Sequence, residues 1–337
     1  MKYPNRMGAL SFPSGTDVSE QVDAFVIGRL CADLYPQQIN TPLEQVRTFE
    51  RFVGGFAGNV ATGLARLGVR VAIVAGVGDD GHGKFVRQFL ADEGVDVQWV
   101  STHPTLRTAL AFCEAWPPDH FPITFYREPT CPDWEVSLDD VPLDQIVAAP
   151  LVYVTGTGLV RDPSRSMVLG VLERRVGHPY SVFDLDWRAS LWGDRAYEYR
   201  ALARIGARLA DIVIGGDSEF AAAGFTPAEA LALGARVAVS KHGPDGVSVH
   251  TLDGGEVRVP GLPVPVVNGL GAGDAFAAAF GDGLLRGLDL KQAILRGNAA
   301  GAIVATRLSC STAMPRAEEV DAVLGGASIV DGVVATA

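Results

Sequence analysis

The chain has 337 residues and a formal net charge of −11, because 39 acidic side chains outnumber 28 basic ones. Hydrophobic residues make up 48% of it, so a disordered chain, a collagen-like repeat and a disulfide-stapled mini-protein are excluded. The acidic balance argues against nucleic acid or an anionic membrane surface as a partner. The 4 cysteines have no C-x-x-C spacing, which speaks against a zinc site and a disulfide framework, so we expect reduced thiols in a cytoplasm.

The chain is predicted to form one large domain, residues 23–325, with a short tail at each end. Residues 1–22 are polar and lack the apolar stretch that a signal peptide needs. Residues 326–337 are the predicted C-terminal tail. The most apolar late stretch, 259–280, is interrupted by three prolines and by Asp274, whereas a membrane helix needs about 20 uninterrupted apolar residues.

From residue 23 onward, short apolar runs alternate with helical patterns. Strands are predicted at Ala24–Gly28, Val71–Ala75, Leu151–Thr155, Tyr180–Leu185, Asp211–Ile214 and Val237–Ser240. Helices with one apolar face are predicted at 59–68, 83–93, 164–175 and 275–285. Strands separated by such helices are typical of β-α-β units, so we expect an α/β fold whose mostly parallel sheet is covered on both faces.

Two segments, at about 36–53 and 106–128, interrupt this alternation. The second contains two predicted strands on either side of a Pro-Pro-Asp turn. Neither segment suits a β-α-β unit. We therefore predict that they form a small β-sheet that projects from the main domain as a lid over a ligand site.

A first glycine motif, Gly76–Gly81, matches the G-x-G-x-x-G of dinucleotide folds and would suggest an NAD-linked oxidoreductase. However, Asp79 and Asp80 stand where a pyrophosphate needs N–H donors and positive potential. An overlapping segment, Gly78-x-x-x-x-Gly83-Lys84, is similar to a phosphate-binding loop, but Phe85 occupies the position of the metal-binding Ser or Thr. A tight acidic turn is the better interpretation of both patterns.

A second motif, Gly271-Ala272-Gly273-Asp274, runs directly into an apolar helix. Its successive backbone N–H groups and the helix dipole would form an anion hole, and Asp274 would lie in the first helical turn. A helix cap alone would explain the aspartate but not the glycines. An anion hole beside a carboxylate suits phosphoryl transfer, in which the carboxylate takes up a hydroxyl proton.

A third glycine cluster, Gly54-Gly55, precedes a predicted helix that begins at Asn59. The glycines would let the backbone approach a ligand, and the Asn59 amide can both donate and accept, as recognition of a polyol requires. A simple N-cap explains Asn59 equally well on local grounds. Asp33 follows the first strand, where open α/β sheets bind ligands, although a solvated loop carboxylate is an alternative.

These motifs together resemble the ribokinase-like (PfkB) carbohydrate kinases from residue 23 to about residue 324. The resemblance implies a three-layer α/β/α sandwich with a β lid. It also implies ATP and Mg²⁺ as cofactors, a small-molecule sugar acid as a partner, and a homodimer formed through the lid. The segment before the anion hole, Asn268-Gly269-Leu270, departs from the family pattern, which leaves a monovalent cation such as K⁺ open.

The resemblance also implies roles for individual positions. Asp274 would be the general base, above an anion hole formed by Gly271, Ala272 and Gly273. The sugar would be held by Asp33, Gly54, Gly55 and Asn59. The nucleotide would be bordered by Ser240, Gly243, Gly246 and Asn298. Glu219 would order water around Mg²⁺.

Four stretches resemble the branch of the family that acts on a sugar acid of myo-inositol breakdown, namely 117–127, 183–188, 240–243 and 307–315. The expected reaction is ATP-dependent phosphorylation of the terminal hydroxyl of 5-dehydro-2-deoxy-D-gluconate; 2-dehydro-3-deoxygluconate or fructose is the alternative acceptor. A carboxylate substrate calls for a bidentate arginine. Arg127 is the first candidate and Arg188 the second, followed by Arg29 and Arg107.

Overall fold

The computed structural model describes residues 22–335. The predicted N-terminal tail therefore lies outside the described residues except for its last residue. Within the described part, no helix is both long enough and apolar enough to cross a membrane.

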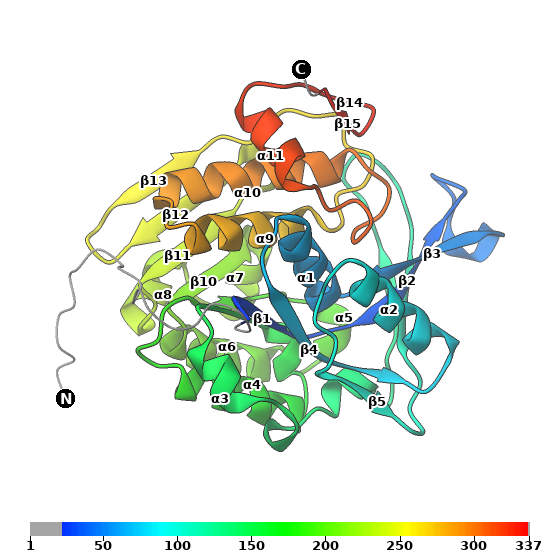
Figure 1. Ribbon diagram of the computed structural model, residues 1–337, viewed down its shortest axis with the longest axis horizontal. Coiled ribbons are helices and arrows are strands. Elements are labelled where there is room, and N and C mark those ends of the chain that lie inside the picture. Colours follow the sequence, from blue (N-terminus) through cyan, green and yellow to red (C-terminus); the bar gives the residue numbers. More distant parts are fainter. Residues whose placement is uncertain (1–21, 336–337) are drawn as a thin grey trace.

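Nine described strands form one central sheet (Figure 1), in the spatial order β13-β12-β11-β10-β9-β8-β1-β4-β5. Their bounds are β1 Ala24–Ile27, β4 Val71–Gly78, β5 Val100–His103, β8 Leu151–Thr155, β9 Ser181–Asp184, β10 Ile212–Gly216, β11 Val237–Lys241, β12 Val247–Thr251 and β13 Glu256–Val259. The strands from β11 to β5 run parallel, and β12 and β13 extend the sheet antiparallel. The prediction of a mostly parallel sheet is confirmed, and all six predicted strands belong to it.

Helices cover both faces of this sheet and complete a three-layer sandwich. One face packs against α1 (Phe56–Arg66), α2 (Gly81–Asp92), α9 (Ala272–Leu285) and α10 (Leu290–Ala305). The other packs against α3 (Leu143–Ala148), α4 (Ser164–Arg174), α6 (Ala196–Leu209), α7 (Asp217–Ala223) and α8 (Pro227–Leu233). Alternation within each strand supplies both cores, since Ala24 and Val26 face the first layer while Phe25 and Ile27 face the second.

A second, four-stranded sheet projects from one end of the sandwich and forms the lid (Figure 1). Its strands, in the order β3-β2-β6-β7, are β2 Cys31–Pro36, β3 Phe49–Gly54, β6 Ala109–Cys113 and β7 Ile123–Tyr126. The lid therefore begins at Cys31, earlier than the expected position near residue 36. The difference arises because β2 pairs in parallel with β6, a partner too distant in sequence to leave a local pattern.

The G-x-G-x-x-G segment is an acidic turn, as its residues indicate. Gly76 and Gly78 belong to β4, and Asp80 is the N-cap of α2. Its carboxylate accepts hydrogen bonds from the backbone N–H groups of His82 and Gly83, at 2.9 and 2.8 Å. The carboxylate thus occupies the helix N-terminus where a dinucleotide phosphate would have to bind.

The remaining described elements lie around these layers. A short helix, α5 (Ala189–Trp192), follows the site-bearing loop after β9. Near the C-terminus, α11 (Ala317–Leu324) packs on the outer side of α10. Residues 326–335, part of the predicted tail, include a hairpin of β14 (Ile329–Val330) and β15 (Val333–Val334) that packs against the same apolar cluster.

Candidate active site

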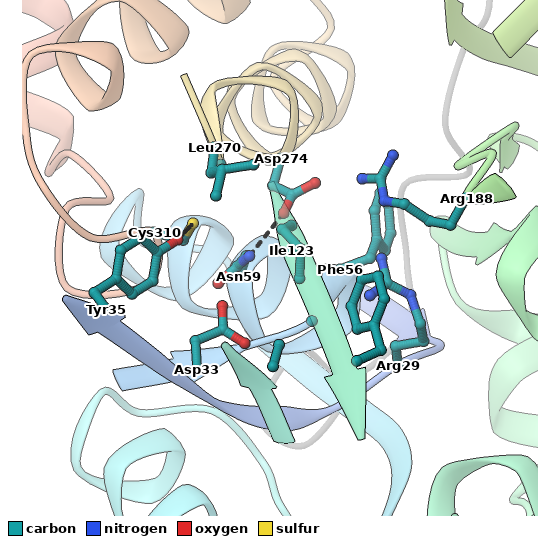
Figure 2. Close-up of a pocket in the computed structure, with 14 residues that line it drawn as sticks. Arg29, Asp33, Tyr35, Phe56, Asn59, Ile123, Arg188, Leu270, Asp274 and Cys310 are labelled. Carbon is teal, nitrogen blue, oxygen red and sulfur yellow. Dashed lines mark hydrogen bonds between the residues drawn. The ribbon is translucent and has the colours of Figure 1, made fainter. Parts of the chain in front are cut away.

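Asp33 lies on the lid strand β2 and points into a pocket between the lid and the sandwich (Figure 2). The side chain fits there because Gly54 on β3, which pairs with Cys31 and so lies diagonally across from Asp33, has no side chain: a Cβ on Gly54 would lie 1.9–2.0 Å from the Asp33 carboxylate atoms. Burial raises the pKa of Asp33 to about 6, although a hydrogen bond from Cys31 and the nearby Arg29 oppose this. Gly54 therefore contributes by leaving space for the carboxylate.

Asn59 and Asp274 meet across the pocket (Figure 2), where Asn59 Nδ2 donates to Asp274 Oδ2 at 2.7 Å. Both side chains come from helix N-terminal turns that begin earlier than predicted. Gly55 caps α1 with φ 83°, and Gly271 caps α9 with φ 82°, conformations that favour glycine. Because glycines make these turns, Asn59 is not an N-cap, and its side chain is available for the pocket.

The pocket contains an acceptor that the protein itself does not satisfy. Asn59 is 4% exposed, and its Oδ1 atom has no hydrogen-bond partner among residues 22–335. Asp33, which is 7% exposed, lines the same pocket. Since buried acceptors are costly when unpaired, this lining favours a ligand that carries several hydroxyl donors.

Asp274 lies in the first turn of α9, next to the predicted anion hole at Gly271, Ala272 and Gly273. Burial raises its pKa, while the hydrogen bond from Asn59 lowers it. A carboxylate in this position, beside a helix N-terminus, can accept a proton from a hydroxyl group that sits in the pocket.

Two arginines line the opposite side of the pocket (Figure 2), and both are held by Asp186. Arg29 Nη2 lies 3.0 and 3.1 Å from the two carboxylate oxygens of Asp186, and Arg188 Nη2 is 3.1 Å from Oδ1. Burial alone would raise the pKa of Asp186, but Arg29 and Arg188 lower it. Arg188 is the more accessible of the two, with a side chain that is 37% exposed against 6% for Arg29.

The other two arginine candidates do not line the pocket. Arg127 directly follows the lid strand β7, and it is buried in an ion pair with Asp133 and stacks over Trp134. Arg107 is exposed and precedes β6. The first-choice assignment of Arg127 as the carboxylate ligand is therefore corrected, because its side chain is only 2% exposed and does not reach the pocket lining.

The predicted nucleotide residues gather around the exit of β11. Ser240 lies in β11 and donates to Asp217 at 3.2 Å, and Gly243 lies in the following turn. A Cβ on Gly246 would be 2.6 Å from the carbonyl carbon of Pro260, the residue whose oxygen accepts a hydrogen bond from Asn298 Nδ2 at 3.1 Å. The structure thus brings these four positions together, outside the pocket that contains Asp274.

Glu219 lies at the start of α7, and its two carboxylate oxygens already accept backbone hydrogen bonds. Oε2 accepts from Gly216 N at 2.7 Å and Oε1 from Trp187 N at 3.1 Å. Among residues 22–335, no group of three or more His, Cys, Asp or Glu side chains is arranged to hold a metal ion. Each oxygen keeps a further lone pair for a water molecule, and the contact of Glu219 with Mg²⁺ through water stays a prediction.

Both polar atoms of the Asn268 side chain already form hydrogen bonds. Its Nδ2 donates to the Leu308 carbonyl at 2.5 Å, and its Oδ1 accepts from Leu270 N at 3.0 Å. The amide thereby braces the glycine turn against the segment around residue 308. Because an amide oxygen has two lone pairs, the hydrogen bond from Leu270 does not decide whether a cation binds there, and the K⁺ site stays a prediction.

Sequence reasoning missed several pocket residues. Tyr35 lies two residues after Asp33 on β2, so its side chain faces the same side of the strand, and recognition of β2 would have predicted that it lines the pocket. The Tyr35 hydroxyl and the Cys310 thiol share a hydrogen bond of 2.8 Å, in which either group can be the donor. Leu270 directly precedes the anion hole. Lys241 was also unassigned, although it follows Ser240 directly, and its amine lies 3.3 Å from Asp184 Oδ2.

A carboxylate at a glycine-rich helix N-terminus, below a lid and beside a polar pocket, is the arrangement of a phosphotransferase that acts on an alcohol group. The comparison with known families agrees: the model of the pfkB family of carbohydrate kinases matches residues 22–317, and the chain belongs to this family.

Individual relatives narrow the comparison. The chain is 34% identical over 317 residues to 5-dehydro-2-deoxygluconokinase of Clostridium tetani, covering 90% of this chain and 93% of that one. An uncharacterised sugar kinase from Pyrococcus horikoshii, solved in complex with ATP, has a TM-score of 0.78 at 28% identity and covers 88% and 96%. A putative ribokinase II from E. coli, with a TM-score of 0.82 at 23% identity and coverage of 90% and 99%, shares the ribokinase-like fold.

Proposed function

We propose that this carbohydrate kinase transfers the γ-phosphoryl group of ATP to the terminal hydroxyl of 5-dehydro-2-deoxy-D-gluconate, a step of myo-inositol breakdown. The observation that carries the proposal is the composition of one pocket. It combines acceptors for hydroxyl groups, Asp33 and Asn59, with a base, Asp274, and an accessible arginine, Arg188. The names of the curated relatives support the same substrate.

The reaction follows from the positions of these groups. The sugar hydroxyls pair with Asp33 and with the free Oδ1 of Asn59, which orients the terminal hydroxyl toward Asp274. Asp274 accepts the hydroxyl proton as the oxygen attacks the γ-phosphorus, and the N–H groups of the Gly271–Gly273 turn stabilise the charge on the transferred group. Glu219 would hold Mg²⁺ through water, and the ion would supply positive charge beside the nucleotide phosphates.

The lid contributes to this chemistry because its inner face forms part of the pocket. Asp33, Ala111, Ile123 and Phe125 belong to lid strands β2, β6 and β7 and line the pocket. Their apolar members exclude water from the reacting groups once sugar is bound, and this strengthens the hydrogen bonds inside.

The substrate assignment is tested with purified protein, MgATP and a panel of acceptors. Formation of ADP is measured with 5-dehydro-2-deoxygluconate, 2-dehydro-3-deoxygluconate and fructose. We expect the highest kcat/KM with the first. A clear preference for fructose would contradict the proposal of a sugar-acid substrate while leaving the kinase assignment intact.

Arg188 is proposed to bind the substrate carboxylate. Arg188→Met removes the bidentate donor, so KM for the sugar acid should rise by about 10- to 100-fold, the cost of a lost charge-assisted hydrogen bond. KM for a neutral sugar that the enzyme accepts should change little. Steady-state kinetics with both substrates checks this; an equal loss of kcat with both would show that Arg188 acts in phosphoryl transfer instead.

The pH dependence should report the buried carboxylates. Burial raises the pKa of Asp33 to about 6 and also raises the pKa of Asp274. Both groups act in the ionised form, which is lost as the pH falls through the raised pKa. We therefore expect kcat/KM for the sugar to decline below a pH of about 6. Rates measured between pH 5 and 8 check this, and circular dichroism over the same range shows whether the protein stays folded. A flat profile would contradict the assignment.

We also propose that two copies associate through the outer face of the lid. Phe49, Phe112 and Tyr126 form a chain of edge-on aromatic contacts there, with ring centroids 5.2 Å apart, and Tyr126 is 60% exposed. Tyr126→Asp should shift the protein from dimer to monomer in light scattering. Tyr197→Asp, on α6, is the matched control that should leave the mass unchanged, and a monomeric wild type would refute the proposal.

A further inference from the structure

Lys241 is the last residue of β11, and its amine lies between the sugar pocket and the expected nucleotide residues. Nζ is 3.3 Å from Asp184 Oδ2, and the side chain is 18% exposed. A Cβ on Gly273 would lie 3.4 Å from Nζ, so the amine stands directly beside the glycine turn that begins α9. Ser240, the preceding residue, belongs to the group around the β11 exit.

The charges around this amine are negative. Burial alone would lower the pKa of Lys241, but Asp184, Glu219 and Asp274 raise it above its usual value, so the amine is protonated at neutral pH. Burial raises the pKa of Asp184 to about 7, with Lys241 opposing the rise. A phosphate that binds beside Nζ would therefore take the place of the Asp184 carboxylate as the partner of the amine, and Asp184 can take up a proton near neutral pH.

The amine also has donors to spare. A protonated lysine carries three N–H donors. Among residues 22–335, Asp184 is the side chain to which Nζ donates, at 3.3 Å. A purely structural ion pair would need only this contact, and it would not require the amine to stand beside a glycine turn that exposes backbone N–H groups.

On the basis of the proposed kinase activity, we propose that Lys241 is a catalytic residue whose amine contacts the γ-phosphate of ATP beside the Gly271–Gly273 turn. The sugar oxygen forms a bond to the γ-phosphorus, and the bond from that phosphorus to the β,γ-bridging oxygen breaks. ADP leaves with the electron pair, and the hydroxyl proton passes to Asp274. The amine keeps its protons and offsets the negative charge on the phosphoryl oxygens.

The test compares Lys241→Met and Lys241→Arg with the wild type. Lys241→Met should lower kcat by about 100- to 1,000-fold, and Lys241→Arg should recover part of the loss. By calorimetry with Mg²⁺, the affinity of Lys241→Met for the β,γ-imido analogue of ATP should fall about tenfold while its affinity for ADP changes less than about twofold. Lys291→Met, an exposed lysine on α10, is the matched control and should behave as wild type.

The outcomes separate this inference from the proposed function. A kcat of Lys241→Met within about threefold of the wild type would overturn the catalytic role. Equal losses of affinity for ADP and for the imido analogue would also overturn it, because they indicate a structural role in the nucleotide site. A wild type that binds neither nucleotide would instead refute the kinase proposal itself, and the inference with it.

Discussion

Asp274→Ala is expected to lower kcat by about 100- to 10,000-fold, the usual contribution of a positioned general base, with little change in sugar affinity. The carboxylate is the proposed acceptor of the hydroxyl proton, whereas the proposed sugar ligands Asp33, Asn59 and Arg188, which line the same pocket, remain. Rates of ADP formation give kcat, and calorimetry with sugar alone gives the affinity.

A second variant guards against a loss of folding. Asp274→Asn keeps the shape of the side chain and a polar contact with Asn59, so it should fold like the wild type and still lack a base. Asp92→Ala, at the exposed end of α2, is the control that should keep full activity. Full activity in either variant at position 274 would refute the assignment of the base.

Gly54→Ala is expected to raise KM for the sugar by about 10- to 100-fold, although it adds only a single methyl group. The methyl carbon would lie 1.9 Å from the Asp33 carboxyl carbon, so the carboxylate must rotate away from the sugar. The backbone at Gly54 is not in the left-handed region, and alanine is therefore accepted there without backbone strain. KM for ATP should stay the same.

Gly81→Ala provides the matched control for this variant. A Cβ at Gly81, the first residue of α2, meets no other atom within 4 Å, so catalysis should be unaffected. Steady-state kinetics and thermal unfolding of both variants distinguish a displaced Asp33 carboxylate from a general loss of stability. An unchanged sugar KM in Gly54→Ala would mean that Asp33 does not bind the sugar.

The central fold follows from local patterns, since each predicted strand is an apolar run with its own flanking signals. Leu151–Thr155 was predicted with the bounds that β8 has in the structure. The lid strand β2 was missed because Asp33 and the terminal Pro36 give it the local composition of a loop. Its strand conformation depends on pairing with β3 and β6, which no local pattern reveals.

The chemistry-bearing residues divide in the same way. Asp274, its glycine turn and Asn59 could be predicted because each motif is continuous in sequence and precedes a helix. The arginines could not be ranked, because their roles depend on which carboxylate lies nearby. Arg127 is buried with Asp133 away from the pocket lining, while Arg188, which is also paired with a carboxylate, is held at the edge of the pocket by Asp186.

The sequence by itself predicted the fold class, the projecting β-sheet and the positions proposed as anion hole and base, because these rest on the order of apolar residues, glycines and carboxylates along the chain. Only the tertiary structure decided which charges face the pocket. Burial and ion pairing decide this, since the amine of Lys241 lies beside Gly273, whereas Arg127 is buried in an ion pair with Asp133 outside the site. Such contacts join residues more than a hundred positions apart in some cases, as with Arg29 and Asp186, and no local pattern encodes them.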